Sequence, residues 1–256
     1  MNTEEFTVTA GHQQLCCTLA VPKASLVGDH SGLLLNISAT AQLALYDETQ
    51  NHPTHPFLRA GHYVLSFDLP NHGERIDAHG ESLLGMGRAI MAGDDPFAQF
   101  VLDGRAALDA CLERVGSKGK VAGYGVSRAG YCLLRLAAAD PRVGAVAGLS
   151  PVTDWGIPEE FTQTCPRTHT WPLLIDHWVD QLAERAIYLS VGSQDDVVGT
   201  EACVRFAIKL FVEQRRALPQ DTLLSQLHVV DSIGHSPSLA SRLQATQFLL
   251  DFCNRV

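Results

Sequence analysis

Short apolar runs recur along the chain, and they alternate with longer segments whose apolar residues repeat every three or four positions. The runs that read as strands lie at 32–38 (GLLLNIS), 62–70, 120–126, 143–150, 186–193 and 225–232. A strand that is apolar on both faces belongs inside a parallel sheet covered by helices. The alternation therefore predicts a doubly wound, three-layer α/β domain.

The segments between these runs read as helices, and the N-terminal segments read as a hairpin. Helical patterns occupy 96–116, 127–140, 200–217 and 236–256, with Thr200 as a candidate N-cap. Segments 4–10 and 13–22, joined at Gly11, predict antiparallel strands at one edge of the sheet. A length of 256 residues is compatible with a single domain that spans the whole chain, 1–256.

Two segments do not follow the alternation. Residues 71–95 contain five glycines and predict a long loop with at most a short helix. Residues 151–180 carry all three tryptophans of the chain. They would follow the carboxyl end of a strand, where ligands bind in open α/β sheets. They are therefore expected to form a small cap-like insertion.

Charge and cysteine content restrict the partners and the compartment. The net charge is −9 and no basic run occurs, which argues against a nucleic-acid partner and against an anionic membrane surface. Seven cysteines without CxxC spacing favour reduced thiols and a cytoplasmic protein. Neither a signal-peptide pattern nor a membrane-spanning apolar run occurs. The oligomeric state stays open, a homo-oligomer included.

The stretch GYGVSRAG at 123–130 lies between an expected strand and an expected helix. A dinucleotide-binding GxGxxG pattern would need its third glycine at position 128, which is Arg128, and no GK[ST] follows for a P-loop. Nucleotide binding is therefore not expected, and neither is any other cofactor. His52 and His55 lie in NHPTHP, where the prolines predict a loop, so they are expected to be surface residues and no metal site is predicted.

The same stretch matches the nucleophile elbow GxSxG, with alanine in the last place. Gly125, Ser127 and Ala129 occupy the three positions, and Gly130 follows. Small residues on both sides of the serine let the strand and the helix approach closely. The alternative is that Ser127 is only a helix N-cap.

An elbow serine requires an acid and then a histidine farther along the chain. Asp195 and Asp196 follow the strand at 186–193, and His235 follows the strand at 225–232. Because each lies just past a strand end, in the required order, their joint occurrence favours a Ser-His-Asp triad over three unrelated polar residues.

With these motifs, the chain resembles the α/β-hydrolase superfamily. It is most similar to small serine esterases and to the catalytic domains of dienelactone-hydrolase and prolyl-oligopeptidase type. FDLPNHGER, SPVTDW, VGSQDDVV and IGH carry the resemblance together with the elbow. It implies a three-layer α/β-hydrolase fold with a mostly parallel sheet of about eight strands. The family pattern GxxD, counted from Gly192, indicates Asp195 as the acid and leaves Asp196 as the fallback. Dienelactone hydrolases typically use cysteine, so Ser127 favours an esterase.

The resemblance also implies acyl transfer to Ser127, with His235 as base and Asp195 orienting it. The oxyanion hole would use the backbone N–H groups of Arg128 and Ser38. Many members of the family have His-Gly before the second donor, whereas this chain has Asn36 and Ile37. The residues expected in the substrate pocket are His72, Trp155, Phe161 and Trp171.

The expected function is hydrolysis of a small carboxylic ester or thioester, with a small-molecule ester substrate as the partner. Three alternatives stay open. The same triad could serve a peptidase or amidase, or an acyltransferase. The departure at 36–41 also admits a non-catalytic ligand-binding protein with this fold.

Overall fold

The computed structural model describes residues 1–220 and 222–255. Their strands form one eight-stranded sheet in the order β1-β2-β4-β3-β5-β6-β7-β8. β1 pairs antiparallel with β2 and β2 with β4, and every later pair is parallel. This confirms the predicted mostly parallel sheet with an N-terminal antiparallel hairpin. The strands are β1 (Asn2–Ala10), β2 (Gln13–Val21), β3 (Leu33–Ile37), β4 (Tyr63–Phe67), β5 (Val121–Val126), β6 (Val143–Leu149), β7 (Ala186–Gln194) and β8 (Gln226–Ile233).

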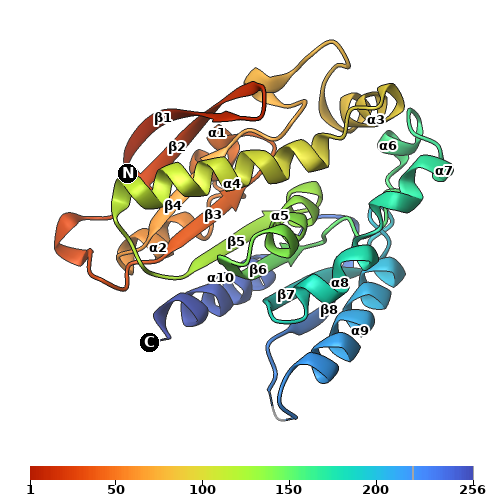
Figure 1. The fold of residues 1–256 in the computed structure, drawn as a ribbon. Coiled ribbons are helices and arrows are strands. Elements are labelled where there is room, and N and C mark those ends of the chain that lie inside the picture. Colours follow the sequence, from red (N-terminus) through yellow and green to blue (C-terminus); the bar gives the residue numbers. More distant parts are fainter. Residues whose placement is uncertain (221, 256) are drawn as a thin grey trace.

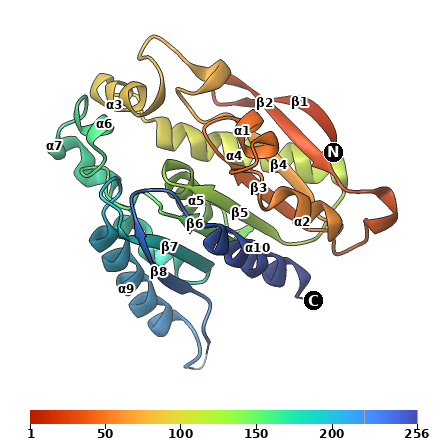
Figure 2. The same cartoon turned by 180° about the vertical axis from the view of Figure 1, so that it is seen from behind.

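Helices cover both faces of this sheet (Figures 1 and 2). One buried cluster joins a sheet face to α4, α5, α8 and α9, and a second joins the opposite face to α1, α2 and α10. The helices are α1 (Ala41–Tyr46), α2 (Thr54–Arg59), α3 (Ser82–Ala92), α4 (Pro96–Val115), α5 (Arg128–Ala139), α6 (Glu159–Thr162), α7 (Arg167–Thr170), α8 (Val179–Leu182), α9 (Thr200–Ala217) and α10 (Leu239–Asn254).

The two-residue period of the strands decides which cluster each side chain joins. Leu33 and Leu35 of β3 pack on the α4 and α5 side, whereas Leu34 between them packs on the α10 side. Neighbouring residues of a strand point to opposite faces, so a strand with a helical layer on each side must be apolar throughout. All five residues of β3 and all five of β4 are buried.

The prediction of a long loop at 71–95 is wrong for its second half, where α3 runs for eleven residues. Gly85 and Gly87 lie inside this helix and serve close packing instead of turns. A Cβ at Gly85 would lie 2.3 Å from the carbonyl oxygen of Gly80, and one at Gly87 would lie 2.2 Å from Oγ1 of Thr164. These glycines therefore allow close contact between segments. The sequence alone does not distinguish a glycine with this role from a glycine in a turn.

The loop predicted around His52 and His55 is also partly helical, because α2 begins at Thr54. Pro53 is the N-cap and Pro56 lies in the first turn. The first backbone N–H groups of a helix have no intrahelical partner, so proline is tolerated there.

Residues 150–185 connect β6 to β7 and carry the short helices α6, α7 and α8 with two 3₁₀ turns. In Figure 1, α6 and α7 extend past the ends of the strands beside α3, whereas α8 lies next to α9. Among the described residues, no helix combines the length and the apolar character that crossing a membrane requires.

Candidate active site

Ser127 stands at the turn between β5 and α5 with φ 57° and ψ −124°. A serine at positive φ is strained, typically by about 1–3 kcal/mol, and needs surroundings that hold it in place. Its backbone N–H donates to the carbonyl of Leu149 at 2.9 Å, and its carbonyl accepts from the N–H of Val152 at 3.2 Å. The end of β6 therefore fixes both sides of the turn.

Gly125 permits the sharp return of the chain. A Cβ at this position would lie 2.7 Å from the carbonyl carbon of Ala129 and 2.8 Å from the backbone nitrogen of Gly130. Both are backbone atoms, so no side-chain rotation relieves the overlap. Ala129 fills the place of the last glycine of the motif and is itself buried.

We expect Gly125→Ala to destabilise the fold by about 1–3 kcal/mol, because it forces β5 and α5 apart. Gly28→Ala is the matched control, since a Cβ there meets nothing within 4 Å. The measurement is urea unfolding of both variants and the wild type. Equal unfolding midpoints for the two variants would contradict this account of the turn.

His235 and Asp195 are in contact, although 40 positions separate them in the sequence. His235 Nδ1 lies 3.0 Å from Oδ2 and 3.2 Å from Oδ1 of Asp195. A carboxylate accepts, so Nδ1 carries the proton and Nε2 is left as an acceptor. Nε2 is buried and has no hydrogen-bond partner among residues 1–220 and 222–255.

Asp195, and not its neighbour Asp196, is the acid that the fold brings to the histidine. The Asp195 carboxylate is buried, whereas Asp196 is exposed. Burial by itself raises the pKa of Asp195, but the hydrogen bond and charge of His235, the Val198 N–H and the Ser150 hydroxyl outweigh it. The pKa therefore lies below its usual value, and the carboxylate is ionised at neutral pH.

Thr200 holds the Asp195 loop. The prediction that it is the N-cap of α9 is wrong. The N-cap is Gly199. The Thr200 hydroxyl donates to the Gly192 carbonyl at 2.6 Å and accepts from the Asp195 N–H at 3.1 Å. Asp195 Oδ1 also accepts from the N–H groups of Val197 and Val198.

A cavity of about 250 Å³ lies beside Ser127 and His235. Both residues expected to supply oxyanion N–H groups are among its walls. The cavity is lined by Ser38, Ala39, Gln50, Val126, Ser127, Arg128, Ala129, His235, Ser236, Pro237 and Arg242. No hydrogen bond joins Ser127 Oγ to His235 Nε2 within the described part of the chain, and such bonds are often long before substrate binds.

The loop that carries Ser38 is tied to the end of β4. Asp68 accepts from the N–H of Ala41 at 2.8 Å, and Ala39 accepts from the N–H of Leu69 at 3.1 Å. Asn36, where the family often has histidine, donates to the Ala44 carbonyl at 2.7 Å. The unusual residue thus anchors α1, and its side chain takes no part in the cavity wall.

The four residues expected in the substrate pocket lie elsewhere than in the wall of this cavity. Trp155 and Phe161 are fully buried and pack on Phe97, with ring centroids 4.5 and 6.3 Å from it. Trp171 is 61% exposed. His72 is buried in the loop after β4, where its Nδ1 lies 2.8 Å from the Pro70 carbonyl. The aromatic side chains of 151–180 therefore mainly build core.

Burial, and to a smaller extent the charge of Arg128, lowers the pKa of His72 to about 4. In the unfolded chain this group titrates near about 6.5, so between these values the unfolded state binds the extra proton. The contribution of neutral His72 to the free energy of unfolding is therefore fully present above about pH 6.5 and is lost as the pH falls toward 4.

Between pH 7 and pH 5, we expect the free energy of unfolding of wild type to fall by about 2 kcal/mol more than that of His72→Asn. Urea unfolding at both pH values measures this. His12→Asn, in the exposed turn between β1 and β2, is the matched control. A pH dependence in His72→Asn equal to that of wild type would contradict the assignment.

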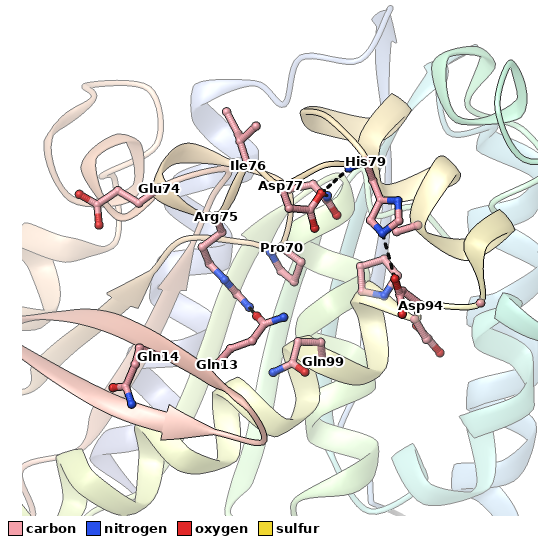
Figure 3. A pocket seen from close by; sticks show the side chains of 15 residues that line it. Gln13, Gln14, Pro70, Glu74, Arg75, Ile76, Asp77, His79, Asp94 and Gln99 are labelled. Atoms are coloured by element: carbon pink, nitrogen blue, oxygen red, sulfur yellow. Dashed lines mark hydrogen bonds and ion pairs between the residues drawn. The ribbon is translucent and has the colours of Figure 1, made fainter.

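A larger cavity of about 590 Å³ lies between the β1–β2 turn, the loop after β4 and the start of α4 (Figure 3). Its polar side chains mainly satisfy one another. Arg75 donates to Gln13 Oε1 at 2.9 Å, and His79 Nε2 lies 2.9 Å from Asp94 Oδ2. Neither Ser127 nor His235 contributes to its wall, so the smaller cavity is the candidate active site.

No protein-family model matches the chain, and no curated protein matches it in sequence. Solved structures do resemble it. A cold-adapted esterase from an Arctic intertidal metagenomic library superposes with a TM-score of 0.70 at 17% identity, over 96% of this chain and 92% of the esterase.

Two peptidases are similar over nearly all of this chain. A putative dipeptidyl aminopeptidase IV from Bacteroides ovatus gives a TM-score of 0.73 at 13% identity, over 98% of this chain and 35% of its own length. An acylaminoacyl peptidase from Pyrococcus horikoshii gives 0.70 at 10% identity, over 99% and 41%. At such identities the likeness concerns architecture alone. With the sheet order and the helices on both faces, it shows that this chain has the α/β-hydrolase fold.

Proposed function

We propose that the protein is a serine hydrolase that cleaves a small carboxylic ester or thioester through an acyl-enzyme. One observation carries the proposal. His235 is held through Nδ1 by a buried carboxylate, and its other ring nitrogen is an unpartnered acceptor at a cavity that Ser127 shares. This is the arrangement that activates a hydroxyl for nucleophilic attack.

In the proposed reaction, Ser127 Oγ attacks the acyl carbon while His235 Nε2 takes the hydroxyl proton. Asp195 stabilises the imidazolium that forms. The negative oxygen of the tetrahedral intermediate accepts from the backbone N–H groups of Arg128 and Ser38. His235 then gives its proton to the departing alcohol or thiol. A water molecule, deprotonated by His235, attacks the acyl-enzyme, and the carboxylic acid leaves as Ser127 regains its proton.

The size of the cavity favours a small substrate over a peptide. A volume of about 250 Å³ is below the roughly 300–1,000 Å³ of pockets that hold drug-sized ligands. The similar peptidases are more than twice as long as the part that this chain matches. The esterase from the Arctic library, by contrast, is matched over 92% of its length.

A cytoplasmic location is part of the same proposal. All seven cysteines are free thiols, and six of them are buried. Secreted proteins usually oxidise paired cysteines, so an unpaired set of this size fits a reducing compartment.

The test is intact-protein mass spectrometry after a fluorophosphonate probe, which reacts with activated serines. We expect one adduct per chain in wild type, none in Ser127→Ala and slower labelling in His235→Ala. Absence of an adduct on folded wild-type protein would overturn the proposal and favour a ligand-binding protein that keeps the fold.

A further inference from the structure

Arg128, next to the proposed nucleophile, is partly buried and its side chain forms no bond to another described residue. Within residues 1–220 and 222–255, five arginines are not exposed, and four of them donate to at least one oxygen. These four are Arg75, Arg135, Arg185 and Arg242. Arg128 alone among the five forms neither a hydrogen bond nor an ion pair there. Partial burial lowers the pKa of its guanidinium.

The groups around Arg128 do not supply that partner. Glu160 of α6 attracts the guanidinium but is exposed and forms no ion pair with it in the described part of the chain. His72, on the other side, has a pKa of about 4 and is neutral at neutral pH. Cys132, one turn along α5, has a pKa raised to about 12 by burial and is a neutral thiol. None of these three groups pairs with Arg128, so an anion that did so would come from outside this set of residues.

The cavity itself is positive in a protein with a net charge of −9. Its wall contains Arg128 and Arg242 and no carboxylate. Asp195 lies behind the His235 ring, and its oxygens are bonded to that ring and to backbone N–H groups. Arg242 donates to the carbonyls of Pro237 and Thr49, which ties two loops together. Arg128 is thus the cation of this wall that forms no hydrogen bond or ion pair within the described residues.

We infer that Arg128 binds a carboxylate of the substrate, and that the preferred substrates are esters or thioesters whose acyl group ends in a carboxylate. The inference rests on the proposed hydrolase function. A guanidinium offers parallel N–H donors that match the two oxygens of a carboxylate. The backbone N–H of the same residue is the proposed donor to the scissile carbonyl. The two ends of the acyl group can therefore be no farther apart than one arginine side chain spans, as in a half-ester of a short dicarboxylic acid.

The test compares two esters of equal size that differ in charge. Monoethyl glutarate carries the carboxylate, and the ethyl ester of glutaric acid monoamide replaces it with an amide. We expect kcat/KM, measured by ethanol release, to be about 10- to 100-fold higher for the carboxylate ester in wild type, as for a hydrogen-bonded charge pair. Arg128→Gln should bring this ratio close to one, and Arg128→Lys should restore part of it.

Arg215→Gln is the matched control, since it removes an exposed arginine near the end of α9 and should keep the wild-type ratio. Thermal unfolding checks that each variant is folded. A wild-type ratio near one would overturn the inference and leave the hydrolase function intact, because the amide ester would still be cleaved. Failure of the fluorophosphonate label would instead remove the proposed function itself.

Discussion

Ser127→Ala is expected to lower kcat for ester hydrolysis by about 10⁶-fold, the largest effect of any single substitution in this chain. Alanine removes the oxygen that would form the acyl-enzyme, and no other hydroxyl in the described wall stands in the strained turn with φ 57°. Binding and the backbone N–H groups would remain, so a residual rate above that of water is expected. The measurement is kcat with 4-nitrophenyl acetate at saturating substrate.

Ser193→Ala is the control for this experiment, because Ser193 is an exposed serine near the end of β7. It should retain wild-type kcat. If Ser127→Ala kept more than about a tenth of the wild-type rate while remaining folded, the acyl-enzyme mechanism would be wrong.

The second large effect is expected for Asp195→Asn, which should lower kcat by about 10⁴-fold. The amide of asparagine can donate to Nδ1, and the imidazole would then carry its proton on Nε2, where it cannot accept the serine proton. The negative charge that stabilises the imidazolium would also be lost. Steady-state kinetics with the same ester measure the effect.

Asp196→Asn is the matched control, since it changes the adjacent, exposed carboxylate in the same way. It should leave kcat within twofold of wild type. Because Asp195 also accepts from Val197 and Val198, urea unfolding of Asp195→Asn separates lost catalysis from a disturbed loop. Equal losses of kcat in the two variants would refute the assignment of the acid.

The sequence alone predicts the sheet well, because each central strand must be apolar on both faces. It also predicts the order of Ser127, Asp195 and His235, because each lies just beyond a strand end. The length of α3 could not be predicted, since Gly85 and Gly87 are explained only by Gly80 and Thr164, which they contact. Their packing partners become visible only when the chain is folded.

The wall of the candidate active-site cavity is the part that the sequence predicts least. Gln50 follows α1 and Arg242 lies on α10, almost 200 positions away, and no local pattern links them. Trp155 and Phe161 were expected there because aromatic residues often form pockets, but they pack on Phe97 of α4. That Arg128 forms no ion pair within the described residues could not be predicted from the sequence, because it depends on where the fold places the carboxylates.

The contact between His235 and Asp195 forms late, because His235 is made long after Ser127. The ribosome makes Ser127, its strand and its helix first, and it makes His235 roughly a hundred residues later. At about 5–20 residues per second this is a delay on the order of 5–20 seconds. Throughout that interval the nascent chain contains the serine without the base that would activate it. On the mechanism proposed above, the growing polypeptide therefore lacks the base for Ser127 until β8 and the loop after it have been made.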